Sequence, residues 1–375
     1  MLSRRQFLIY GGAGLAIVGL GLMFSSPIGR RPEESREVVV EPVATNLRIP
    51  WSITFISSDE ALFTERGGLV KRLDLSSGRV EEWGSIEVAA VGEGGLLGIE
   101  SLKNSRTRIY IYHAYRDSAG KLWNRVVRYL DEGGLADPEI LVNGIPGAAI
   151  HDGGRIRFGP DGMLYITTGD ARMMELSQRL DSLAGKILRI APDGTVPSDN
   201  PFKGSPIYSY GHRNPQGIDW HPETRLLYST EHGPSGENGW FAHDEVNLVM
   251  AGKNYGWPEV IGAAGRSEFV DPILHSGLET WAPAGASFYS GRLIPEWRNV
   301  FFFAALRGAA LHMVRIGDEP DVVVSHEKLC EGEFGRLRDV VEGPDGALYV
   351  LTSNRDGRGV PREGDDKILR IATRS

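Results

Sequence analysis

The chain has 375 residues, of which 41% are hydrophobic, so it can bury a sizeable core, and its formal net charge of −8 argues against nucleic acid as a partner. A single cysteine, Cys330, excludes an internal disulfide, thiolate zinc sites and thioredoxin-type redox chemistry. Neither GxGxxG nor GxxxxGK[ST] occurs, so nothing favours a nicotinamide or ATP site.

The first thirty residues form a unit separate from the rest of the chain. Residues 3–8 read SRRQFL, which is typical of a twin-arginine export signal, and the apolar run at 9–24 is short for a transmembrane helix. Because no clear A-x-A site follows, residues 1–30 are interpreted as a removed signal or as an uncleaved membrane anchor. We therefore expect export by the twin-arginine route, to a periplasmic, extracellular or outward-facing anchored position. Residues 31–43 are predicted to be a linker, and residues 44–375 to be the folded domain.

From about residue 38 onward one pattern recurs, in which a polar or glycine-bearing turn precedes a short strand and a second strand ending in a basic residue. GPDG followed by a Leu-Tyr strand occurs twice, and KILRI occurs twice. Pro presets φ and Gly accepts a positive φ, so these strings mark turns between strands. Six copies of the pattern lie at residues 61–75, 108–130, 155–190, 217–249, 286–316 and 338–372.

Self-similarity at this spacing indicates structural repeats, and about four alternating strands per repeat favour propeller blades over a helical solenoid. The sequence therefore predicts an all-β protein, a six-bladed β-propeller with four-stranded antiparallel blades. Sustained helical periodicity is almost absent, so helices should be scarce. A pair of β-sandwiches is the alternative, but it leaves the repeats unexplained.

Functional residues of a propeller usually lie on loops at one end of the central channel. We expect one such end to gather six residues that fall at comparable positions of successive repeats, namely His151, Asp170, Arg213, Gly233, Arg307 and Arg336.

His151 begins the string HDGG, ahead of a predicted strand, and a histidine at a loop tip can act as a general base near neutral pH. Asp170 ends the next strand of the same repeat and could orient the imidazole. A purely structural His–Asp pair is the alternative at this point.

The string GHRNPQG at 211–217 places Arg213, Asn214 and Gln216 between glycines and a proline, which predicts a loop presenting rigid polar donors. A planar guanidinium fork suits a bound carboxylate or a quinone oxygen. The alternative is a structured surface loop whose arginine pairs with a local acid.

Arg336 and Arg338 alternate at the start of a predicted strand, so both should project to one side, and Arg307 adds a third positive charge. Converging arginines predict an anion with several carboxylates or a phosphate, whereas scattered surface ion pairs are the alternative.

Residues 231–258 are rich in oxygen donors and glycine, which weakly suggests calcium, although EF-hand spacing is absent.

Several strings in fixed order resemble the soluble quinoprotein aldose sugar dehydrogenases of the glucose/sorbosone dehydrogenase family. These strings are HDGG, TTGD, GHRNPQG, EHGP, DEVN and KNYGWP, and the similarity runs from about residue 44 to residue 371. The resemblance implies a six-bladed propeller that binds pyrroloquinoline quinone (PQQ) and calcium. It also implies oxidation of aldose sugars to aldonolactones, with electrons passed to an external acceptor such as a quinone, a dye or a redox protein.

By this resemblance, His151 is the base that takes the proton of the anomeric hydroxyl, and Asp170 is its orienting partner. Arg213 and Asn214 would contact quinone oxygens, and Gln216 would support their loop. Clamps for the cofactor carboxylates would be Arg307, Arg336 and Arg338. Carbonyls of Gly233 and Pro234 would bind the catalytic calcium, and Glu245 and Tyr255 a second, structural calcium.

The sequence departs from the best-known glucose enzyme at Glu93, where that enzyme has a substrate-contacting glutamine, so Glu93 is assigned to the sugar site and the preferred sugar is open. The segment SGENGWFAH, at 235–243, is also longer than the family pattern leads one to expect. Two other functions stay open: a calcium-dependent lactonase on the same kind of propeller, and a non-catalytic propeller that binds sugar or protein.

Overall fold

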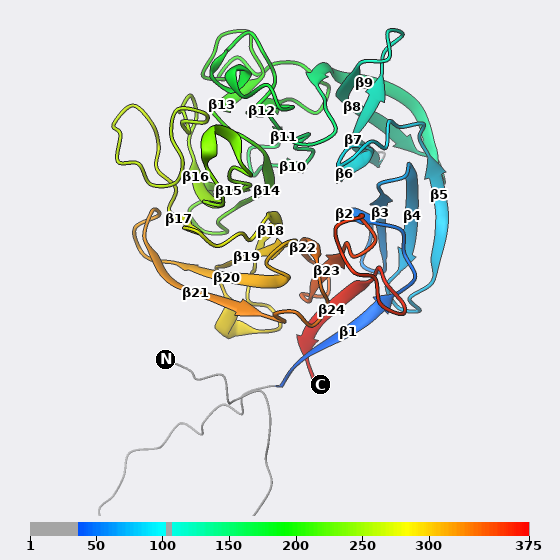
Figure 1. Cartoon of the computed structure of the whole chain (residues 1–375). Helices are drawn as coiled ribbons and strands as arrows, with labels where there is room; N and C mark the ends of the chain where they lie inside the picture. Colours follow the sequence, from blue (N-terminus) through cyan, green and yellow to red (C-terminus); the bar gives the residue numbers. More distant parts are fainter. Residues whose placement is uncertain (1–36, 103–106, 375) are drawn as a thin grey trace, which may run out of the picture. The chain divides into compact units, whose positions relative to one another are not determined.

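The computed structural model describes residues 37–102 and 107–374, which form six four-stranded antiparallel sheets arranged as a ring (Figure 1). The first blade contains β2 (Pro50–Phe55), β3 (Glu60–Glu65), β4 (Leu69–Asp74) and β5 (Val80–Ser85), and the second contains β6 (Leu96–Leu102), β7 (Arg108–Arg116), β8 (Leu122–Asp131) and β9 (Leu135–Pro146). The third contains β10 (Ile156–Phe158), β11 (Leu164–Thr168), β12 (Lys186–Ile190) and β13 (Ile207–Tyr210), and the fourth contains β14 (Pro215–Trp220), β15 (Leu227–Glu231), β16 (Glu245–Val249) and β17 (Leu274–His275). The fifth contains β18 (Pro283–Phe288), β19 (Val300–Ala305), β20 (Ala310–Ile316) and β21 (Val323–Leu329), and the sixth contains β22 (Leu337–Glu342), β23 (Leu348–Thr352), β24 (Ile368–Thr373) and β1 (Val38–Ala44).

Each of the six sequence repeats falls in a different sheet, so the predicted six-bladed propeller is confirmed and the sandwich alternative is wrong. The described residues contain three short 3₁₀ helices, η1 (Met174–Gln178), η2 (Glu237–Gly239) and η3 (Pro295–Trp297), and no α-helix, as expected from the lack of helical periodicity. Among these same residues no helix is long and apolar enough to cross a membrane.

The sixth blade is built from both ends of the propeller chain. Strand β1 pairs antiparallel with β24, with Val38 opposite Thr373 and Val40 opposite Ile371 (Figure 1). The predicted linker at 31–43 is therefore wrong over its last six residues, 38–43, which are ladder residues of this blade. Residues 38–44 read VVVEPVA, without alternation of apolar and polar residues, and only the distant partner β24 makes them a strand. The predictions made for residues 1–36 lie outside the described residues.

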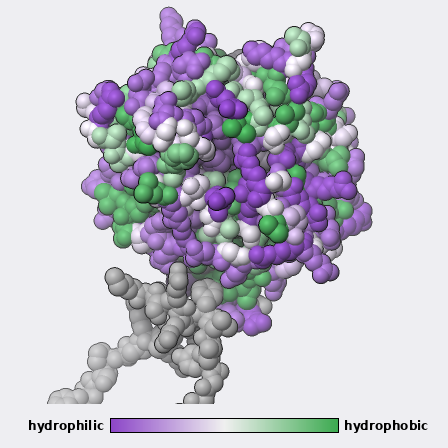
Figure 2. Space-filling model, viewed as in Figure 1, coloured by the Kyte–Doolittle hydropathy of each residue, from purple (hydrophilic) through white to green (hydrophobic). Residues whose placement is uncertain are grey.

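The hydrophobic core lies between adjacent blades rather than in the central channel. One cluster joins β7 residues such as Tyr110 and Tyr112 to β11 residues Leu164 and Ile166, and another joins the fifth and sixth blades. Strands β11, β12 and β23 are buried along their whole length, because both faces of these sheets pack against neighbouring blades. Hydrophilic residues cover much of the face in Figure 2.

The inner strands turn selected side chains towards the channel by means of β-bulges. Register shifts occur near the start of five inner strands, β2, β6, β14, β18 and β22. The residues skipped by three of these shifts, Trp51, Gln216 and Arg338, all line the same cavity. A bulge bends its strand and re-aims a side chain, so these irregularities position functional groups.

A buried ion pair links the third blade to the sixth. The Arg155 guanidinium donates to Asp339 Oδ2 at 2.8 Å and to the Gln216 carbonyl at 3.0 Å, and its carbon lies 4.4 Å from the Trp51 ring. Both charged side chains are at most 1% exposed. Arg155 therefore ties together inner strands of four blades, since Ser52 Oγ accepts another of its bonds at 2.8 Å.

Replacing Asp339 by Ala is expected to lower the free energy of unfolding by about 3–5 kcal/mol, because it leaves the Arg155 charge buried without a counterion. Urea unfolding followed by tryptophan fluorescence measures the change. Glu139→Ala, which removes an exposed partner of Arg128, is the control and should cost about 1 kcal/mol or less. Equal destabilisation by the two substitutions would contradict the role given to Arg155.

Candidate active site

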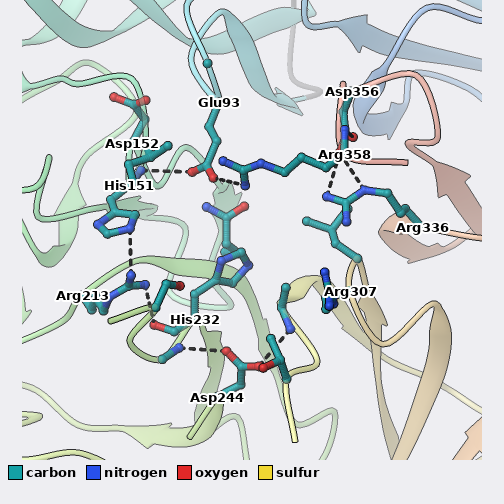
Figure 3. Close-up of a pocket in the computed structure, with 18 of the residues that line it drawn as sticks. Glu93, His151, Asp152, Arg213, His232, Asp244, Arg307, Arg336, Asp356 and Arg358 are labelled. Atoms are coloured by element: carbon teal, nitrogen blue, oxygen red, sulfur yellow. Dashed lines mark hydrogen bonds and ion pairs between the residues drawn. The ribbon is translucent and has the colours of Figure 1, made fainter. Parts of the chain in front are cut away.

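A cavity of about 680 Å³ opens at one end of the channel. Its lining contains nine of the residues predicted from the sequence, namely Glu93, His151, Arg213, Gln216, Gly233, Pro234, Arg307, Arg336 and Arg338. They come from loops and strand starts of several blades, so the expected convergence on one mouth is confirmed for five of the six residues named for it, Asp170 being the exception (Figure 3). Asp170, Asn214, Glu245 and Tyr255 are not part of the lining.

The HDGG loop holds the His151 ring at the cavity wall. The backbone of His151 has a left-handed φ of 64°, and Gly153 follows with φ 62°. A Cβ at Gly153 would lie 2.6 Å from the Thr167 carbonyl oxygen, so this close approach requires glycine. Non-glycine residues in this region are strained, and such strain concentrates at functional sites.

The hydrogen bonds of His151 define its tautomer. Nε2 lies 2.9 Å from Arg213 Nη2, and a guanidinium can only donate, so Nε2 accepts and carries no proton. Nδ1 then carries the proton and donates it to Asp170 Oδ1 at 2.8 Å. With a side chain only 6% exposed, the imidazole is oriented as a neutral base whose Nε2 lone pair is directed at Arg213, a residue of the cavity lining.

Asp170 lies behind His151 and is held by three donors. Its Oδ1 also accepts the Arg172 amide at 2.8 Å, and its Oδ2 accepts the indole N–H of Trp257 at 2.9 Å. The carboxylate is 2% exposed and receives only donors, which suits it to orient the imidazole and to stabilise a positive charge on it.

Arg213 bonds to groups on three sides. Besides His151, it donates from Nη2 to Glu237 Oε1 at 2.8 Å and from Nη1 to the His232 carbonyl at 3.3 Å. Burial opposes ionisation of Glu237, but the charge and hydrogen bond of Arg213 outweigh it and lower the pKa of Glu237 to about 2. Glu237 was not predicted as a site residue, because nothing in the unusually long segment 235–243 indicates where its carboxylate lies.

The other residues of the GHRNPQG loop support the HDGG loop. Asn214 Oδ1 accepts the Gly153 amide at 3.0 Å, and Gln216 Nε2 donates to the Gly153 carbonyl at 3.1 Å. Gln216 Oε1 also accepts from Arg338 Nη1 at 3.1 Å. Gln216 thereby links the loop of His151 to an arginine of the sixth blade.

Glu93 joins His151 to the opposite side of the cavity mouth. Its Oε2 accepts the backbone N–H of His151 at 3.0 Å, and its Oε1 accepts from Arg358 at 2.6 Å (Figure 3). Burial works against the ionised form of Glu93, but the charge of His232, the His151 amide and Arg358 lower its pKa to about 2. Any group that binds Glu93 is therefore held at a fixed distance from His151.

Four buried nitrogen atoms around the cavity have no hydrogen-bond partner, namely Arg213 Nε, Asn214 Nδ2, His232 Nε2 and Arg338 Nε. Burial lowers the pKa of Arg338 to about 9, although the charge of Asp356 partly opposes the shift, and burial lowers the pKa of His232 to about 3. Unpaired buried donors cost free energy unless a ligand satisfies them. The three donors among these atoms, on Arg213, Asn214 and Arg338, suit an anionic ligand rich in oxygen acceptors.

The predicted metal ligands lie in two places. Gly233 and Pro234 line the cavity, where the Pro234 carbonyl also accepts the Ala242 amide at 2.9 Å. Glu245 lies opposite Glu231 in the β15–β16 ladder. Burial, and to a smaller extent repulsion from Glu231, raises the pKa of Glu245 well above the usual range. Tyr255 stacks on His212, whose Nδ1 bonds Glu231 at 2.8 Å. In the described part of the chain, no group of three or more His, Cys, Asp or Glu residues is arranged to hold a metal ion.

Six ionisable residues of the cavity lining were missed by the sequence analysis, namely Arg66, Asp152, His232, Asp244, Asp356 and Arg358. Asp152 and His232 adjoin predicted residues in HDGG and EHGP, so their place in these strings was an available signal. Burial raises the pKa of Asp152 to about 6. Nothing in the local sequence distinguishes Arg66 or Arg358 from the other arginines of the chain.

The model of the Glucose / Sorbosone dehydrogenase family matches residues 47–369. The chain belongs to this family. "Aldose sugar dehydrogenase YliI" of Escherichia coli K12 is 32% identical over 347 residues, which cover 85% of this chain and 91% of the relative. "Quinoprotein glucose dehydrogenase B" of Acinetobacter calcoaceticus is 28% identical over 83% of this chain and 84% of the relative.

Solved structures of this glucose/sorbosone dehydrogenase family have the same fold. The PQQ-bound form of aldose sugar dehydrogenase from Streptomyces coelicolor superimposes with a TM-score of 0.79 at 38% identity, covering 90% of this chain and 99% of that one. The apo-form of the soluble enzyme from Escherichia coli gives the same TM-score of 0.79 at 29% identity. The family assigned from the motifs is therefore confirmed, together with its oxidoreductase class.

Proposed function

We propose that this chain is a PQQ- and calcium-dependent aldose dehydrogenase that oxidises the anomeric hydroxyl to a lactone and passes electrons to an external acceptor. The observation that carries the proposal is the hydrogen-bond pattern of His151, a neutral imidazole backed by Asp170 at 2.8 Å, at a cavity beside which three buried donors, on Arg213, Asn214 and Arg338, are unpaired. The PQQ-bound relative supports the choice of cofactor. Aldose sugars are proposed as substrates from the names of the relatives.

Residues of the cavity are suited to hold the cofactor. The free Nε atoms of Arg213 and Arg338 and the free amide of Asn214 would donate to its oxygens, and Gln216, Arg307 and Arg336 would complete the predicted set. Carbonyls of Gly233 and Pro234 would bind the calcium ion, with Glu245 and Tyr255 at a second ion. A cation beside Glu245 would relieve its repulsion from Glu231. When bound, the quinone supplies the acceptor for the hydride that leaves the sugar carbon.

The residues of this chain would handle the proton and orient the sugar. His151 Nε2 takes the proton of the anomeric hydroxyl as the C–H bond breaks, and Asp170 stabilises the resulting imidazolium. Glu93 accepts a sugar hydroxyl at a position fixed by its bond to the His151 amide. Arg213 must release Nε2 before the base can act, and Glu237, which already bonds the same Nη2 atom, would keep the guanidinium paired after that release.

The lactonase alternative requires a metal held by carboxylate and asparagine side chains. The cavity instead presents six arginines, Arg66, Arg213, Arg307, Arg336, Arg338 and Arg358, which favour an anionic cofactor.

We also propose that the protein is exported by the twin-arginine route, with the N-terminal segment as signal or anchor. Fractionation of cells producing the full chain, with the signal arginines replaced by lysine as the comparison, tests this proposal.

An absorbance titration tests the function. Purified protein is titrated with PQQ, with and without calcium, and an aldose and an acceptor dye are then added. We expect a saturable change in the quinone spectrum that requires calcium, followed by dye reduction. Saturable binding with no dye reduction for any aldose would reject the dehydrogenase, and lactone hydrolysis without PQQ would favour the hydrolase.

Replacing Glu237 by Gln is expected to lower kcat by about tenfold, because Arg213 loses a charged partner and stays on the His151 lone pair. Stopped-flow reduction of the PQQ-loaded protein by sugar measures the step directly. Glu223→Gln, which removes an exposed partner of Arg298, is the matched control and should leave the rate unchanged. An unaltered rate in E237Q would show that Arg213 leaves His151 without help from Glu237.

A further inference from the structure

Arg358 lines the cavity with a guanidinium group that the protein uses only in part. Its side chain is 57% exposed, and Nη1 is bonded to Glu93 Oε1 at 2.6 Å. Figure 3 shows this side chain extending from the loop of Asp356 towards Glu93. Within residues 37–102 and 107–374, no acceptor is bonded to Nε or Nη2 of Arg358. These two atoms form one edge of the planar fork, and that edge is available to a ligand.

The backbone that carries Arg358 is held in place by the sixth blade. The Arg358 amide donates to Asp356 Oδ1 at 2.9 Å, and Asp356 Oδ2 accepts from Arg336 Nη2 at 2.8 Å. A Cβ at the next residue, Gly359, would lie 2.6 Å from the Asn354 carbonyl oxygen, so the loop turns back closely on itself and requires glycine there. The position from which the guanidinium extends is therefore fixed relative to the cavity, as a specific contact with a substrate requires.

Glu93 sets the distance between this cation and the base. Its Oε2 accepts the backbone N–H of His151 at 3.0 Å, while its Oε1 is bonded to Arg358. Both oxygens of Glu93 are thus engaged and its charge is balanced, whereas Arg358 keeps a free pair of donors. The group that best fits those donors is a carboxylate, because two parallel N–H bonds match its two oxygens.

We propose that Arg358 is a specificity-determining residue, and that its free Nε–Nη2 edge binds the carboxylate of a uronic acid whose anomeric hydroxyl faces His151. This inference rests on the proposed function and names a substrate class for it. A uronic acid carries its anomeric carbon and its carboxylate at the two ends of one carbon chain, so a single sugar can meet both residues. The chemical step is the same as for a neutral aldose, since the anomeric carbon gives up a hydride and its hydroxyl a proton, and the carboxylate is unchanged.

A comparison of D-glucuronate with D-glucuronamide isolates the charge, because the amide has nearly the same size and is neutral. With protein loaded with PQQ and calcium, we expect kcat/KM to be about tenfold higher for glucuronate, mainly through KM, since the carboxylate is remote from the reacting carbon. Arg358→Gln should make the two substrates about equal. Arg358→Lys keeps the charge but loses the planar fork, so it should give an intermediate ratio.

Two further measurements separate recognition of charge from a structural role of Arg358. R358Q leaves Glu93 without its counterion, so kcat/KM for protonated D-glucosamine relative to D-glucose should rise in this variant. Calorimetric titration of glucuronate and glucuronamide into loaded His151→Asn protein gives the same comparison as dissociation constants, without turnover. Arg355→Gln is the matched control, because Arg355 is an exposed arginine of the same loop that donates to the Asp365 carbonyl and does not line the cavity.

A glucuronate-to-glucuronamide ratio near one in the wild type would overturn the proposal, as would a wild-type ratio in R358Q, or in R358K should R358Q not fold. An equal loss for both substrates would also overturn it, because Arg358 would then serve only to hold Glu93. If loaded wild-type protein oxidises neither charged nor neutral aldoses, the proposed function fails instead, so the two failures are distinguishable.

Discussion

His151→Asn is expected to lower kcat for sugar oxidation by about 10²–10⁴-fold, because the variant has no group that can take the hydroxyl proton. Asn is the suitable replacement, since His151 has φ 64° and asparagine tolerates the left-handed region. The backbone N–H that donates to Glu93 is retained. Reduction of the PQQ-loaded protein by sugar, measured under single-turnover conditions, reports the loss.

The matched control for this substitution is His243→Asn. His243 also has a left-handed backbone, with φ 55°, its ring bonds the Phe241 carbonyl, and His243 itself is not part of the cavity lining. PQQ affinity, measured by absorbance, should stay within a few-fold of wild type in both variants. A kcat in H151N within tenfold of wild type would show that another group removes the proton.

Asp170→Asn should lower kcat by a similar factor of about 10²–10⁴, although it changes only one atom. All three partners of Asp170 are donors, namely His151 Nδ1–H, the Arg172 amide and Trp257 Nε1–H. The new amide must therefore face a donor. If it faces His151, Nδ1 has to accept, and the proton moves to Nε2, which removes the lone pair of the base.

A second substitution separates this tautomer effect from simple loss of stability. Trp257→Phe in the D170N background removes one donor, so the amide can turn away from His151. We expect this double variant to recover part of the lost rate, and no recovery would argue against the tautomer explanation.

The fold could be predicted from the sequence because each blade is specified locally. Repeated GPDG turns and short alternating strands define one sheet at a time, and all six copies proved to be separate blades. The start of the domain was wrong by six residues, since β1 is specified by its pairing with β24, more than 300 residues away. Local pattern carries no information about such a partner.

The candidate site was predictable where a functional residue lies within a motif. His151, Arg213 and Gln216 stand in such strings, and the structure brings them together in one cavity. Glu237 and Arg358 were not predictable in this way, because their roles depend on which side chains lie opposite them.

The sequence by itself determined the type of fold, the family and most of the polar groups around the cavity, because turns, alternation and motifs are properties of neighbouring residues. Only the tertiary structure decided which of those charges are already paired. Arg336 and Arg338 are equivalent in the sequence, yet Arg336 meets Asp356 while Arg338 meets only the neutral Gln216. The difference arises because the pairing of a charge depends on distances across the ring, which are set when the blades close.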